Sequence, residues 1–294
     1  MSQAKNVGLK SAGGTAPTRL RQIALVVRDF SKARQQLTHV LGTEVMFEDP
    51  AVAQWGIKNF LVPLGGDVIE VVTPVQENTT SGRLLDKRGE GGYMIIMQTE
   101  DARKRREYIE SKGLSKVIFS VEHGDVACIQ YHPKGIPGGM MPELDSHTPT
   151  PENPTPLTTR FSPWHACGSD RKVYYPGMKR SAHLSLEGCV LRLAPGQTSH
   201  EDAARRWEEI FGVARSRDLL AFTNARMGFC RGEEGLPEGL VSITVGVNGK
   251  EKFEGIWKRA EEMGVARGGR GWIEMCGVRW YLMLTGYGDD KGKL

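Results

Sequence analysis

The residues with the most reactive side chains in this 294-residue chain are its cysteines and histidines. The five cysteines are widely spaced, and no two of them form a C-x-x-C pair. They are Cys128, Cys167, Cys189, Cys230 and Cys276. This spacing predicts neither a zinc knuckle nor a disulfide framework. It favours reduced, half-buried thiols of the kind found inside cells.

The seven histidines give a similarly plain pattern. Four of them fall beside predicted helices or in predicted turns, where solvated side chains are expected, and these are His39, His123, His147 and His200. His183 lies at the start of a predicted strand and is interpreted as structural. The sequence around His165 does not indicate a role for it. His132 ends a predicted strand, where it could contact a ligand or make a structural hydrogen bond.

Glycine-rich and basic stretches could bind phosphate, but their context argues against it. The glycines in 89–92 and 135–139 do not lie between a strand and the start of a helix, so we interpret them as turns. The basic run 103–106 lies on a predicted exposed helix. The net charge is only +4 and is spread along the chain, so nucleic acid is not an expected partner. No apolar run is long enough to span a membrane.

The elements that must position these residues repeat along the chain. Residues 20–27 form a predicted strand, which is followed by a helix with Ser31 as N-cap and Gly42 as its stop. Strands are then predicted at 43–47, 59–64 and 68–73, where the Gly65-Gly66-Asp67 turn joins the last two. The same order returns three more times, with first strands at 93–99, 184–193 and 240–247. The sequence therefore predicts an α+β fold of four βαβββ modules.

A proline-rich stretch separates the second module from the third. It carries Pro149, Pro151, Pro154, Pro156 and Pro163, so it predicts a connector without regular structure. Its aromatic second part is expected to lie along a domain surface. The predicted organisation is a flexible tail at 1–18, a first domain at 19–146, the connector at 147–180, a second domain at 181–288 and a tail at 289–294.

Several stretches resemble the vicinal oxygen chelate superfamily, which includes glyoxalases, epimerases, extradiol dioxygenases and resistance proteins. The resemblance is carried by QIALVVRDFSKARQQLTHVLG, FLVPLGGDVIEVVTP, SGRLLDKRGEGG and YHPKGIPGGMMPELD, which look most like methylmalonyl-CoA epimerases. It implies that each pair of modules forms one cup-shaped sheet around a small molecule. Over the second domain the resemblance is architectural, and the corresponding positions there (Cys189, Gly228, Val241 and Tyr281) imply a degenerate site.

The family holds a divalent ion with four side chains on the concave face of the cup. Carried over to this sequence, those positions are Gln22, Glu70, Met94 and Glu143. Strand alternation places Gln22 on one face with Ala24. Because a thioether and an amide replace imidazoles, the pattern favours a site without metal and without any cofactor. Two carboxyls in an apolar cup then point to acid–base chemistry, with Glu70 and Glu143 as the predicted catalytic residues.

The resemblance also implies which residues contact the ligand. The predicted substrate-binding residues are Gln22, Trp55, Tyr93, Met94 and His132. The sequence favours a metal-independent isomerase, epimerase or lyase that acts on a small apolar carbonyl or enol compound. A non-catalytic binding protein of the resistance type remains an alternative, as does an enzyme whose metal is held by Gln22, Glu70 and Glu143. The chain is expected to be cytoplasmic and a monomer or homodimer, with no partner beyond its ligand.

Overall fold

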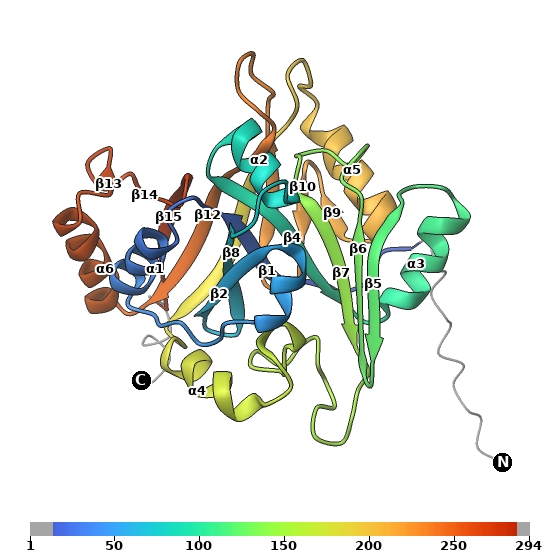
Figure 1. Ribbon diagram of the computed structural model, residues 1–294, viewed down its shortest axis with the longest axis horizontal. Coiled ribbons are helices and arrows are strands. Elements are labelled where there is room, and N and C mark those ends of the chain that lie inside the picture. Colours follow the sequence, from blue (N-terminus) through green and yellow to red (C-terminus); the bar gives the residue numbers. More distant parts are fainter. Residues whose placement is uncertain (1–13, 287–294) are drawn as a thin grey trace, which may run out of the picture.

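The computed structural model describes residues 14–286, so the predicted tail at 289–294 and most of the one at 1–18 lie outside the described residues. The described part contains two separate β-sheets (Figure 1). Both follow the βαβββ plan, with one strand of the first module reduced to a single bridge, and this confirms the predicted α+β fold. No helix within residues 14–286 is both long and apolar enough to cross a membrane.

The first sheet comes from the first two modules. Its strands are β1 (Thr18–Val26), β2 (Ile57–Leu64), β3 (Asp67–Pro74), β4 (Gly91–Thr99), β5 (Val117–His123), β6 (Val126–Tyr131) and β7 (Met141–His147). They lie in the order β2-β3-β1-β4-β7-β6-β5. The antiparallel pair of β1 and β4 forms the centre, and β3 and β7 flank it as parallel neighbours. The last strand of each module is therefore next to its first strand.

The second sheet repeats this plan. Its strands are β8 (Leu184–Arg192), β9 (Ala214–Ser216), β10 (Leu219–Ala221), β11 (Arg226–Cys230), β12 (Gly239–Asn248), β13 (Ala266–Arg267), β14 (Trp272–Met275) and β15 (Val278–Thr285). Their order is β13-β14-β15-β12-β8-β11-β10-β9, so β8 and β12 take the central places of β1 and β4.

Six α-helices and two short 3-10 helices accompany these sheets in the described part of the chain. They are α1 (Phe30–Leu41), α2 (Thr80–Arg88), α3 (Ala102–Ser111), α4 (Arg171–Arg180), α5 (His200–Phe211) and α6 (Lys250–Glu262), with η1 (Pro50–Trp55) and η2 (His165–Cys167). Asp29, not the predicted Ser31, caps α1 by accepting from Lys32 N, and Gly42 ends the helix in a left-handed conformation. Neither α2 and η1 nor η2 and α4 of the connector are among the elements expected from the sequence.

The outer faces of the two sheets share one hydrophobic core. Alternate residues of β1, such as Ile23 and Leu25, pack with Ile243 and Val245 of β12 in a single buried cluster. In the middle β4 contacts β12, while α1 lies beside α6 on one flank and α3 beside α5 on the other (Figure 1). Gly92 permits this approach, because a Cβ at that position would lie 2.4 Å from Leu240 Cβ. The concave face of the first sheet is consequently free to carry the site.

The predicted strand at 43–47 is reduced to one isolated bridge between Phe47 and Leu61. The segment leaves the sheet because it packs against α4, where Glu44 pairs with Arg180 and Thr43 hydrogen-bonds Ser181. Its deviation makes room for the connector on the concave side of the sheet.

The connector also differs from its prediction as an irregular surface segment. All but one of its prolines lie before position 164, and the exception, Pro176, lies inside α4. Asp170 caps this helix by accepting from Lys172 N. Trp164 is fully buried against the concave face of the first sheet together with Cys167, Tyr174 and Met178. The aromatic residues thus fill part of the cup instead of covering its outside.

Candidate functional site

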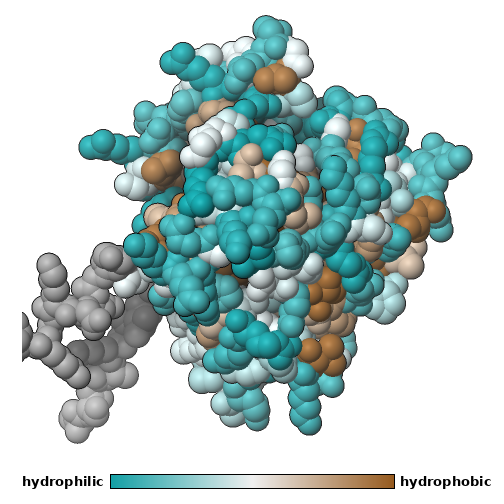
Figure 2. Space-filling view, turned by 90° about the vertical axis from the view of Figure 1, so that its left-hand side faces the viewer, coloured by the Kyte–Doolittle hydropathy of each residue, from teal (hydrophilic) through white to brown (hydrophobic). Residues whose placement is uncertain are grey.

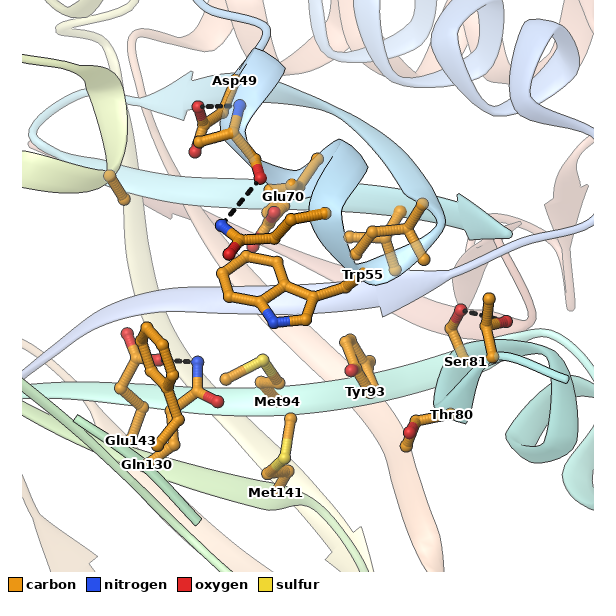
Figure 3. A pocket seen from close by; sticks show the side chains of 18 of the residues that line it. Asp49, Trp55, Glu70, Thr80, Ser81, Tyr93, Met94, Gln130, Met141 and Glu143 are labelled. Atoms are coloured by element: carbon orange, nitrogen blue, oxygen red, sulfur yellow. Dashed lines mark hydrogen bonds between the residues drawn. The ribbon is translucent and has the colours of Figure 1, made fainter. Parts of the chain in front are cut away.

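A cavity of about 810 Å³ occupies the rest of the concave face of the first sheet (Figure 3). Six of the predicted site residues line it: Gln22, Trp55, Glu70, Tyr93, Met94 and Glu143. The structure places His132 outside the cavity, where it is exposed and its Nδ1 accepts from Lys134 N. No lysine or arginine within residues 14–286 lines this cavity. The space therefore suits a neutral, partly apolar molecule better than an anion.

Glu70 on β3 is a buried carboxyl held by two amides. Gln22 Nε2 donates to its Oε2 at 2.8 Å, and Asn59 Nδ2 donates to its Oε1 at 2.7 Å. Trp164 Nε1 in turn donates to Gln22 Oε1 at 2.7 Å, which fixes the orientation of the amide. Burial raises the pKa of Glu70 to about 7, although the two amide hydrogen bonds oppose this rise. At neutral pH this carboxyl can therefore either accept or release a proton.

The same hydrogen bonds test whether the inherited positions fit the family's divalent ion. Both oxygens of Glu70 accept from amides, and the amide oxygen of Gln22 accepts from Trp164. Met94 offers only a thioether, which suits Cu(I) and not a hard or borderline divalent ion. Gln22, Glu70, Met94 and Glu143 do not fit that ion as a set.

Glu143 lies on β7, on the other side of the central strands from Glu70. Its Oε2 accepts from Gln130 Nε2 at 2.7 Å. Asp145, two residues further along the same strand, is fully buried and lies 2.8 Å from His165 Nε2 through its Oδ2. Burial raises the pKa of both carboxyls, and the nearby Asp145 adds to the rise at Glu143. Burial lowers the pKa of His165.

Apolar and aromatic side chains form the entrance of the cavity. Trp55 at the end of η1 packs edge to face on Phe119 of β5, with ring centroids 5.5 Å apart. Trp55, Ile118 and Val121 are each about 44–45% exposed. Tyr93 of β4 also lines the cavity, and burial raises its pKa to about 12, so its hydroxyl remains protonated at neutral pH.

Four residues of the site were missed by the sequence analysis: Asn59, Asp145, Trp164 and His165. Strand alternation could have found Asp145, because it shares a face of β7 with Glu143. No local signal marks the other three, since they approach from a neighbouring strand or from the connector. His147, predicted to be solvated, is instead buried at the end of β7 near Trp164, and burial lowers its pKa to about 4.

The positions of the second cup that correspond to the site differ from those of the first. Of its four corresponding positions, Cys189 points into the shared core and Tyr281 is exposed. Within residues 14–286 the one cluster of His, Cys, Asp and Glu suited to a metal ion is in the first domain, at Cys128, Glu143, Asp145 and His165. The face of the protein in Figure 2 is largely hydrophilic, with hydrophobic side chains in small groups.

A cup-shaped sheet of two βαβββ modules that encloses polar side chains defines a glyoxalase-like domain. Residues 23–155 match the family model described as "Glyoxalase-like domain". This match agrees with the resemblance of residues 20–145 to the vicinal oxygen chelate superfamily, which includes the glyoxalases. A search of curated protein sequences finds no match to the chain.

Solved structures similar to part of the chain include two methylmalonyl-CoA epimerases. A variant of the Streptomyces coelicolor enzyme in complex with 2-nitronate-propionyl-CoA is 22% identical, with 45% of this chain and 96% of that chain covered and a TM-score of 0.39. The Mycobacterium tuberculosis enzyme is 22% identical, with 49% and 95% covered and a TM-score of 0.39. A hypothetical protein from Staphylococcus aureus is 10% identical, with 91% and 99% covered and a TM-score of 0.55, so the likeness in fold extends over both domains.

Proposed function

We propose that the first domain is an isomerase, epimerase or lyase that moves a proton on a small, neutral carbonyl or enol compound. One observation carries this proposal: a buried carboxyl with a pKa near neutrality, Glu70, is held in a fixed orientation in the wall of a cavity of about 810 Å³. An acid–base group works best when its pKa is close to the operating pH. The proton transfer needs no ion at the inherited positions.

In the proposed reaction Glu70 removes a proton from the carbon next to the carbonyl group. The electron pair of the broken C–H bond moves to the carbonyl oxygen, which becomes an enolate. The hydroxyl of Tyr93 lines the same cavity and keeps its proton, so it can donate a hydrogen bond to this oxygen. Return of the proton from Glu70 to a different carbon of a conjugated enolate gives the isomer. Delivery of a proton to the same carbon by water on the opposite face, with the proton of Glu70 passing to the hydroxide left behind, gives the epimer. Departure of a leaving group from the next carbon with its bonding electrons gives the product of a lyase.

The lining of the cavity also restricts the substrate. Asp49, Glu70, Glu77 and Glu143 line it, and none of the lining residues is lysine or arginine. A phosphate or carboxylate would therefore meet no cationic partner. We propose a neutral substrate whose apolar part contacts Trp55 and the β5 side chains at the entrance.

The non-catalytic binding protein is the second candidate, and one observation favours it. Both oxygens of Glu70 already accept hydrogen bonds from protein amides, which is also the arrangement of a purely structural buried carboxyl. The two functions differ in whether Glu70 exchanges protons with a bound ligand.

The test begins with a thermal-shift screen of neutral and anionic carbonyl compounds, since binding to the folded state alone raises stability. Hits are incubated with the protein in D₂O, and exchange at the carbon next to the carbonyl is followed by NMR. We expect exchange with neutral hits that is lost in Glu70→Gln and kept in Glu77→Gln, a matched change at an exposed carboxyl of the same cavity. Ligands that bind without exchange would establish the binding protein instead.

A further inference from the structure

Four side chains with metal-ligating atoms converge at the β6–β7 edge of the cavity. Cys128 of β6 is the direct cross-strand partner of Asp145 on β7, so both side chains lie on the concave face. Glu143 lies two residues before Asp145 and shares that face. One ligand atom of each of these residues and of His165 lies within 4.8 Å of the others.

His165 reaches this group from the connector, whose position is fixed by buried contacts. Trp164, its neighbour in sequence, donates through Nε1 to Gln22, and its backbone N–H donates to the hydroxyl of Tyr174. His165 Nε2 then lies 2.8 Å from Asp145 Oδ2. The fold therefore holds an imidazole against a thiol and two carboxyls from a separate segment of the chain.

One carboxylate oxygen of this group has no hydrogen-bond partner in the described part of the protein. Asp145 is fully buried, yet its Oδ1 has no hydrogen-bond partner within residues 14–286. The nearby guanidinium of Arg21 is turned to Ser162 instead, with Nη1 on its hydroxyl and Nη2 on its carbonyl oxygen. A buried acidic atom without a partner is costly, and a bound cation would remove that cost.

We propose that Cys128, Glu143, Asp145 and His165 bind one borderline divalent cation, with Zn²⁺ the best fit. A thiolate, an imidazole nitrogen and two carboxylate oxygens form the mixed donor set that Zn²⁺ takes in four-coordinate sites. Hard ions such as Mg²⁺ and Ca²⁺ prefer oxygen alone, so a thiolate and an imidazole disfavour them. Binding displaces the proton of the Cys128 thiol together with the protons held by Glu143 and Asp145, and all of them are released to solvent.

This site differs from the positions implied by the family resemblance. It shares only Glu143 with them and takes its other three ligands from β6, from a later position on β7 and from the connector. Cys128, Glu143 and His165 also line the cavity, so the bound ion would face the ligand from the side opposite Glu70. A thiolate and two carboxylates outweigh the charge of a divalent ion, so the occupied site would stay negative and would still favour a neutral ligand. The site does not depend on the proposed proton transfer, because it is defined by the protein alone.

The test uses the full chain, first stripped with a chelator and then titrated with Zn²⁺ or with Co²⁺ as a spectroscopic probe. We expect one equivalent of either metal after desalting, and a near-ultraviolet thiolate-to-Co²⁺ absorption band. Cys128→Ser should remove the band, and His165→Ala should weaken binding about 100-fold or more, since losses in the second shell of a metal site already cost about 10–100-fold. Cys189→Ser, a buried cysteine of the second domain, is the matched control and should bind like the unchanged protein.

Two results would overturn the proposal. One is less than a tenth of an equivalent of metal on the folded, unchanged protein. The other is an unchanged stoichiometry and absorption band in both Cys128→Ser and His165→Ala. His165 has a partly exposed side chain, so its variant remains informative if the Cys128 variant does not fold. Glu70→Gln should still bind one equivalent, which separates failure of the metal site from failure of the proposed function.

Discussion

Replacing Glu70 by glutamine should stabilise the protein at alkaline pH much more than at acidic pH. A pKa raised from 4.5 to about 7 corresponds to a cost of about 3 kcal/mol for ionising this carboxyl in the folded state. Below pH 4.5 the carboxyl is protonated in both states, so this cost is absent. It grows as the pH rises and is complete above pH 7.

The stability difference between Glu70→Gln and the unchanged protein should therefore shift by about 2–3 kcal/mol in favour of the variant between pH 5 and pH 8. Any loss of hydrogen bonding to Gln22 and Asn59 is independent of pH and cancels in this comparison. The assay is urea unfolding at both pH values, followed by circular dichroism. Glu77→Gln is the control and should stay within about 0.5 kcal/mol of the unchanged protein at both. A Glu70→Gln difference that does not change with pH would refute the reasoning.

The remaining predictions concern the cavity and its lining. Proton exchange on a bound ligand should rise from pH 6 to pH 8 as Glu70 ionises, and a flat rate would contradict its role as the base. Tyr93→Phe should lower the exchange rate about 100-fold or more, as measured by NMR, and leave ligand affinity nearly unchanged. Trp55→Ala should weaken ligand binding in calorimetry without lowering stability in urea by more than about 1 kcal/mol, because the side chain is 44% exposed. Trp164→Ala should cost about 3–5 kcal/mol in urea unfolding, because the ring is fully buried and orients Gln22.

The modules could be predicted because their signals are local. In β1, alternate residues such as Ile23 and Leu25 pack into the shared core, while Ala24 faces the cup. This alternation has a period of two residues, which can be recognised in the sequence. Gly42 ends α1 for a similarly local reason. The strand expected at 43–47 was a wrong prediction, because the conformation of this segment depends on contacts with α4, more than 120 residues later in the chain.

The site was predictable only where strand position decides which way a side chain points. Gln22, Glu70, Met94 and Glu143 line the cavity because each occupies a concave position on a central or flanking strand. The partners that set their chemistry come from elsewhere.

Asn59 reaches Glu70 across the β2–β3 pair, and Trp164 reaches Gln22 from a connector whose prolines predicted an irregular surface segment. The connector enters the cup because burying Trp164 removes a large aromatic surface from water. No periodic pattern in the sequence predicts a contact of this kind between the connector and the sheet.

A carbon-13 NMR titration of the glutamate side chains tests the central claim most directly, with Glu70→Gln used to assign the resonance. The account predicts that the Glu70 carboxyl titrates with a midpoint near pH 7, because burial in the cup outweighs its hydrogen bonds from two amides. A midpoint near 4.5, the value of an ordinary solvated glutamate, would contradict it.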